Sequence, residues 1–162
     1  GDGGDMVGYA ARKGTIYIKG SVGDLVGCNM RGVEGQGGPV IVVGGGVKKR
    51  AFESTSGGTG IITGHGLVEG QPIIGDNFAS GLFGGAIYVR DTTDEIGKHI
   101  DPEHRNNLII EEILPQDDSL LYTELTNYCH ELGIDLNEVV QGTWTRITSK
   151  TRNPLGEVYL EG

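Results

Sequence analysis

The residues best suited to chemistry are four histidines and several carboxylates. His99, Asp101, Glu103 and His104 lie close together in sequence, and imidazole with carboxylate is a ligand set that zinc and iron accept. An exposed polar loop is the simpler interpretation of this cluster. His65 stands between two glycines and could act as a general base, but no serine, cysteine or carboxylate lies at a spacing that would complete a catalytic group. We therefore predict no catalytic, cofactor-binding or metal-binding residue.

Glycine–aspartate pairs are the second candidate for chemistry, because they recur at positions 4–5, 23–24 and 75–76. A loop that binds an anion or a metal is one interpretation, but no copy has the second carboxylate or the spacing of a calcium loop. We expect each aspartate instead to accept hydrogen bonds from backbone N–H groups of its own turn. The glycines also form no dinucleotide-binding loop, since no Gly-x-Gly pair is followed by a third glycine three residues on.

Each of these glycine–aspartate pairs is the start of one copy of a repeat. Each copy continues with an apolar residue, a small residue, a glycine-rich turn and a short β-branched strand, at 15–18, 40–43 and 86–89. The residues that define the repeat are Gly4, Asp5, Gly8 and Gly14, then Gly23, Asp24, Gly27 and Gly32, then Gly75, Asp76, Asn77, Gly81, Gly84 and Gly85. A unit of this size cannot bury its own apolar face and must stack on its neighbours. The repeat therefore predicts an all-β solenoid built as a parallel β-helix.

Between positions 43 and 75 the repeat is lost. The segments 59–64, 67–69 and 72–74 suggest one more coil that carries an insertion. The basic cluster at 48–50 lies among glycines and serines, so we interpret 44–58 as a loop.

Composition divides the chain near position 91. Of its 30 glycines, 25 precede that position, whereas residues 91–138 hold 13 acidic and two basic residues. We predict glycine-rich coils over 1–91 and, over 92–162, the last strands, a capping helix and a tail packed on the same domain. The net charge of −9 argues against nucleic-acid or anionic-membrane partners. Without a signal-peptide pattern or an apolar run of spanning length, the cytoplasm is the expected location.

The acidic extension has clear secondary-structure signals. A strand is expected over 108–113, and Asp117 and Asp118 mark a helix start. Apolar residues then recur at helical spacing until Gly133 ends the helix, at Leu121, Leu125, Tyr128, Cys129 and Leu132. A short helix over 135–140 and an extended segment over 144–148 follow. An amphipathic helix must cover something, and an open end or flank of the coils is the simplest choice. Cys28 and Cys129 show no metal or redox spacing.

The stretch from Asp76 to Val89 resembles the glycine-repeat (GXGXG) domain at the C-terminus of the glutamate synthase large subunit. That family has a run similar to Asn-Phe-Ala-Ala-Gly-Met-Ser-Gly-Gly before an apolar strand, which is matched here by Asn77, Phe78, Ala79, Gly81, Gly84 and Gly85. Segments 107–111 and 117–125 also resemble the strand and acidic helix that follow in the family.

The resemblance implies a right-handed parallel β-helix that performs no catalysis itself. In the whole synthase this domain braces the amidotransferase part against the synthase part, where ammonia from glutamine converts 2-oxoglutarate to glutamate. FMN and an iron–sulfur cluster are then expected on partner domains and none on this chain. Some archaea carry the parts as separate polypeptides, so the implied partners are other glutamate synthase domains or subunits.

Two alternatives stay open, because the 33–39 turn and the 48–50 cluster do not match the synthase. The chain is also similar to the glycine-repeat β-helical subunit of formylmethanofuran dehydrogenase, a molybdenum or tungsten enzyme of one-carbon metabolism. It could equally be a free-standing interaction module that self-associates as a homo-oligomer.

Overall fold

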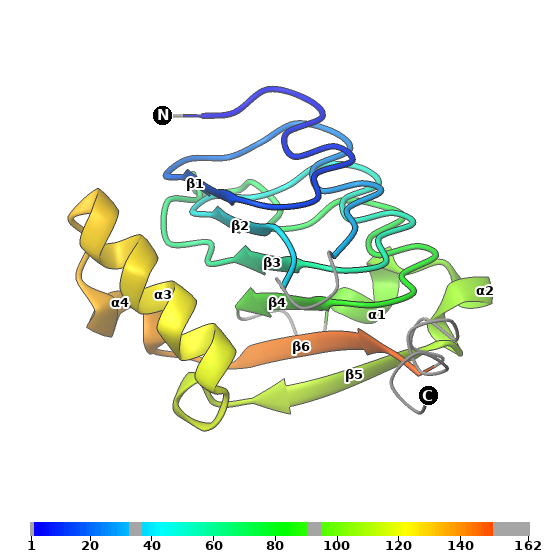
Figure 1. Ribbon diagram of the computed structural model, residues 1–162. Coiled ribbons are helices and arrows are strands. Elements are labelled where there is room, and N and C mark those ends of the chain that lie inside the picture. The colour runs from blue at the N-terminus through cyan, green and yellow to red at the C-terminus, as the bar shows by residue number, and fades with distance from the viewer. Residues whose placement is uncertain (1, 33–36, 91–94, 151–162) are drawn as a thin grey trace.

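The computed structural model describes residues 2–32, 37–90 and 95–150, and Figure 1 shows their arrangement. Six strands form one open sheet in the order β1-β2-β3-β4-β6-β5. The first four are parallel: β1 (Thr15–Ile18), β2 (Val40–Val43), β3 (Thr59–Ile62) and β4 (Ala86–Arg90). β6 (Trp144–Ser149) adds antiparallel to β4, and β5 (Leu108–Ile113) adds antiparallel to β6 at the edge.

The central strands are buried on both faces, and their apolar, largely β-branched residues suit that position. In β2, Ile41 and Val43 face a core that the sheet shares with the glycine-rich loops. Val42, between them, faces a second core under the helices. β4 repeats this alternation, with Ile87 on the loop side and Tyr88 on the helix side. The sheet is therefore the middle layer of three.

The loop layer consists of four stacked segments, which we call arms 1 to 4: residues 5–11, 24–30, 49–55 and 76–82. In each arm the second, fourth and sixth residues have positive φ, as in arm 3 at Arg50 (60°), Phe52 (59°) and Ser54 (55°). The amides of successive left-handed residues therefore point to opposite neighbouring arms. Thus the Arg50 N–H donates to the Asp76 carbonyl (2.9 Å) in arm 4, whereas the Phe52 N–H donates to the Val26 carbonyl (2.8 Å) in arm 2. Each inner arm is bonded to the arms on both sides.

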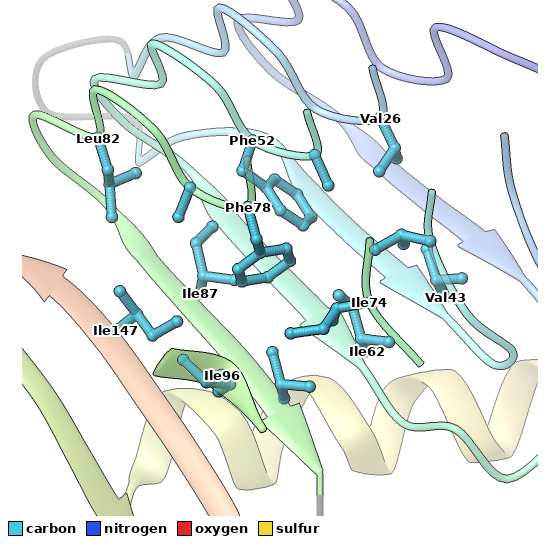
Figure 2. Packing of buried hydrophobic residues seen from close by; sticks show 14 of the residues in the cluster. Val26, Val43, Phe52, Ile62, Ile74, Phe78, Leu82, Ile87, Ile96 and Ile147 are labelled. Carbon is cyan, nitrogen blue, oxygen red and sulfur yellow. The ribbon is translucent and has the colours of Figure 1, made fainter. Parts of the chain in front are cut away.

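Side chains from the arms fill the space between the loop layer and the sheet (Figure 2). Phe52 and Phe78 meet edge to face with ring centroids 6.0 Å apart, and both are fully buried. Ile87 of β4 lies beside them, so three elements meet at this point. Ile96 and Ile147 close the core beyond β4.

Helices cover the opposite face of the sheet. α3 (Ser119–Leu132) begins at its N-cap Asp118 and ends at Gly133, which has a φ of 67°. α4 (Leu136–Val140) begins at its N-cap Asp135. The predicted apolar face of α3 is confirmed, because Leu121, Leu125, Tyr128 and Cys129 are buried against Val42, Ile61 and Tyr88. α3 therefore covers a flank of the stack.

Three shorter elements complete the chain. α1 (Ile96–His99) lies against arm 4, where the Phe78 N–H donates to the His99 carbonyl at 3.0 Å. α2 (Pro102–Arg105) follows, and the 3-10 helix η1 (Pro115–Asp117) leads into α3. The predicted strand over 108–113 and the predicted helix over 135–140 are confirmed as β5 and α4.

The prediction of an all-β solenoid, and with it of a right-handed parallel β-helix, is wrong. The chain is a mixed α/β fold with one open, mixed six-stranded sheet and several helices. Two physical reasons account for the difference. The arms are turns with left-handed residues at every second position, so they form no second sheet. β6 and β5 also join antiparallel and end the parallel series. The predicted domain boundary between 91 and 92 lies outside the described residues.

Candidate functional site

The repeat residues come together as columns across the arms. Asp5, Asp24 and Asp76 occupy the first position of arms 1, 2 and 4, and Lys49 occupies it in arm 3. Asp5 Oδ1 accepts the Asp24 N–H at 2.8 Å, and Asp24 Oδ1 accepts the Lys49 N–H at 3.1 Å. The expectation that each aspartate bonds its own turn is therefore wrong for Asp5 and Asp24. These two carboxylates each join one arm to the next, and the series of bonds stops at Lys49 because an ammonium cannot accept a hydrogen bond.

The repeat glycines have different structural roles at different positions. The fourth position of the arms holds Gly8, Gly27, Phe52 and Ala79, all with positive φ. A Cβ on Gly27 would lie 2.5 Å from the Phe52 ring, so glycine there leaves room for the aromatic side chain of the next arm. Gly4 has open space around it and no positive φ.

The remaining repeat residues lie in the arms or at the entrances to strands. Asn77 and Gly81 are left-handed residues of arm 4, at 56° and 67°. A Cβ on Gly23 would meet Asp5, and one on Gly75 would meet the backbone of Lys48. At the strand entrances, Gly14 (94°) and Gly85 (79°) have positive φ, a Cβ on Gly84 would meet the Ser56 carbonyl, and Gly32 passes close to Gly57.

Arm 3 is the part of the repeat that sequence reasoning missed. Its backbone follows that of the other arms although it lacks the glycine–aspartate pair. The segment 44–58 was interpreted as a loop around a basic cluster, but Lys49 begins an arm and Ala51 and Phe52 are buried. The β3 strand that follows was expected. The sequence did carry one signal. Ala51 and Phe52 are adjacent apolar residues at the third and fourth positions of arm 3, where arm 4 has Phe78 and Ala79.

A groove crosses the corner of the stack beside the aspartate column. It holds a pocket of about 390 Å³ whose floor is formed by Val22, Val47 and Ile74, one from each of three successive repeats. The exposed Lys48 lines it, as does His99 of α1. Lys48 also lines a second pocket, of about 390 Å³, that reaches arm 1. The groove can therefore receive an extended apolar segment with polar groups at its rim.

The histidine and carboxylate side chains between 99 and 104 do not come together as a ligand set. His99 Nδ1 lies 3.4 Å from Asp76 Oδ1, whereas Asp101 accepts the Glu103 N–H at 3.0 Å and caps α2. His104 lines a separate pocket of about 260 Å³ beside Phe83. Within the described residues, no group of three histidine, cysteine or acidic side chains could hold a metal ion.

The two cysteines are buried and form no disulfide. Cys28 lies in the same column as Tyr9 and Ser80, and its thiol donates to the Arg50 carbonyl at 2.7 Å. Burial raises the pKa of both thiols. Neither is an activated nucleophile, since activation requires a lowered pKa.

A polar cluster that was not predicted lies at the start of α3. Asp118 Oδ1 accepts the Leu121 N–H at 3.0 Å, and Oδ2 accepts the Tyr88 hydroxyl and Arg146 Nη1, both at 2.9 Å. Arg146 also bonds Glu111 of β5 at 2.7 Å. Burial alone would raise the pKa of Asp118, but these donors together lower it. Burial raises the pKa of Tyr88. The cluster fastens α3 to three strands.

His65 lies at the other end of the helix layer. Its Nδ1 is 2.6 Å from the Thr63 hydroxyl, and its ring meets Tyr128 of α3 edge to face at 5.9 Å. The predicted alternatives for His65 were a general base or a turn histidine. No carboxylate, serine or cysteine bonds it among the described residues, and its neighbours Thr63 and Tyr128 are buried.

Comparison with known proteins identifies the repeat. A search of curated proteins finds no match. A family model described as the GXGXG motif matches residues 3–153, which include all four arms and all six strands. Within the described ranges, no helix is long and apolar enough to span a membrane. The chain therefore belongs to the GXGXG motif family, the domain found in the large subunit of glutamate synthase.

Proposed function

We propose that this chain is a non-catalytic scaffold of a glutamate-synthase-type oxidoreductase. It braces the amidotransferase part, which releases ammonia from glutamine, against the synthase part, which forms glutamate from 2-oxoglutarate. FMN and the iron–sulfur cluster belong to those partner domains, and the assembly works in the cytoplasm. The family membership supports this proposal.

The observation that carries the proposal is how the motif uses its polar groups. Asp5 and Asp24 each accept a backbone N–H of the following arm, and backbone amides of the inner arms bond neighbouring arms. Groups engaged in this way hold the arms in register and are not available to a substrate. A regular stack of this kind offers a stable surface on which other domains can dock.

The groove beside Lys48 is the docking surface that we assign to a partner. Its apolar floor and charged rim suit an interface that has a buried centre and a polar edge. A variant Lys48→Glu should weaken the complex, whereas Lys13→Glu, an exposed lysine outside both groove pockets, should leave it intact.

The test is affinity purification of the full chain from its native cell, followed by an absorbance spectrum and metal analysis of what it retains. Flavin and iron–sulfur absorbance in a stoichiometric complex is the expected result. Molybdenum or tungsten would favour the one-carbon enzyme instead. A chain that is recovered alone and colourless would refute the scaffold proposal and favour a free-standing module.

A further inference from the structure

We propose that His65 is a protonation switch that holds α3 against the sheet while it is neutral and loosens it when it is charged. The inference concerns regulation of the helix layer and does not depend on the proposed partner enzyme. It starts from the contacts of the imidazole ring.

Of the two nitrogens of the neutral ring, only Nδ1 has a hydrogen-bond partner among the described residues. Nδ1 can donate to the Thr63 hydroxyl at 2.6 Å, and that hydroxyl can donate in turn to the Gly44 carbonyl at 3.2 Å. Nε2 is buried and has no hydrogen-bond partner among the described residues. Protonation at Nε2 therefore places a donor where no acceptor lies, and a buried donor without a partner is costly.

Burial and two of the three nearby charges act in the same direction. Burial of the ring and then the positive charge of Arg90 on β4 lower the pKa of His65; Glu138 on α4 opposes them, and Lys19 after β1 adds to them. Because the pKa is lower in the folded state, the folded protein binds this proton less readily than the unfolded chain. Stability is therefore lost as the pH falls below about 6.5, the ordinary value for histidine.

The ring is placed so that this loss falls on the helix layer. His65 packs against Tyr128, which is fully buried on α3 and meets Tyr17 of β1 edge to face at 5.5 Å. The Tyr17 hydroxyl in turn lies 3.5 Å from Glu124 of α3. Opening of α3 would expose the ring to water, so a charged His65 favours the open state, and release of α3 would uncover Tyr17 and Val42.

The experiment is hydrogen exchange of α3 between pH 7.5 and 5.5, after correction for the intrinsic rate. Opening of α3 should increase as the pH falls, by at most about tenfold per pH unit because one proton is involved. His65→Gln, which cannot titrate, should remove this dependence. His130→Gln, which replaces an exposed histidine on the same helix, should keep it. Identical pH dependence in wild type and His65→Gln would overturn the proposal.

A second measurement needs no variant. Histidine ring signals in an NMR titration of the wild-type chain report when His65 charges, and Tyr128 ring signals report the seating of α3. The proposal requires both to change together. If His65 charges while the Tyr128 signals stay constant, the switch is absent, even if His65→Gln fails to fold.

Discussion

Replacing Gly60 with alanine should destabilise the protein through one contact, the edge of the Phe52 ring. Gly60 lies in β3 without a positive φ, so alanine fits its backbone. The added Cβ would overlap Cε1 and Cζ of Phe52 and lie 3.1 Å from Ile87 Cδ1. Carbon atoms prefer about 3.5–4.0 Å. The ring is fully buried in the core and packs against Phe78 (Figure 2).

The magnitude follows from packing. Overfilling a tight core costs about 1–3 kcal/mol, so Gly60→Ala should lose that amount of unfolding free energy. Phe52→Ala should lose about 3–5 kcal/mol, because a large buried ring leaves a cavity. In the double variant the new methyl occupies space that the ring has left. The double variant should therefore lose less unfolding free energy than the two single variants together, by about 1 kcal/mol or more.

The assay is equilibrium urea unfolding followed by fluorescence of the single tryptophan, Trp144, which is buried in the helix-side core and reports on the whole fold. Gly4→Ala is the matched control, since nothing lies within 4 Å of its added Cβ, and it should change stability by less than about 0.5 kcal/mol. Strict additivity of Gly60→Ala and Phe52→Ala would refute the reasoning, as would a Gly60→Ala variant as stable as Gly4→Ala.

Three further outcomes are expected. Gly85→Ala should cost more than about 3 kcal/mol or prevent folding, because its φ is 79° and the added Cβ would meet the Gly58 carbonyl; thermal melting will show whether it does. Gly14→Ala has a φ of 94° but open space, so the same melts should show only about 1–2 kcal/mol of backbone strain. Asp118→Ala should cost about 3 kcal/mol at neutral pH, since it removes an N-cap and the partner of Arg146. Because the pKa of Asp118 is lowered, that difference should be complete above about pH 4 and shrink on further acidification, and acid titration of both proteins in urea tests this.

Local signals in the sequence predicted the local elements well. The helix that ends at Gly133 and the strand over 108–113 have the expected bounds, because caps and periodicity act over a few residues. The repeat also predicted that its units stack, and they do. It could not predict the conformation of the arms, since nine of the left-handed positions hold residues other than glycine. The glycine-rich repeat therefore led to the wrong prediction of a solenoid.

The polar clusters could not be predicted from sequence, because their members come from distant elements. Tyr88, Asp118 and Arg146 meet only when β4, α3 and β6 are assembled, and no spacing in the chain records this. Lys49 is a related case, since only its position in the column shows that it replaces an aspartate. The family resemblance, by contrast, depended on a continuous run around Asn77 and was confirmed by the family match.

The strand order also implies an order of assembly. β1 to β4 pair with their nearest neighbours along the chain, so each pairing closes only the loop of one repeat. β6 pairs with β4 across all the helices, and β5 reaches the sheet only through β6. Closing the longer loop has the larger entropic cost, so we expect the parallel strands to form first and β6 to join last. During synthesis, the core at Ile87 would then stay open until Ile147 has left the ribosome.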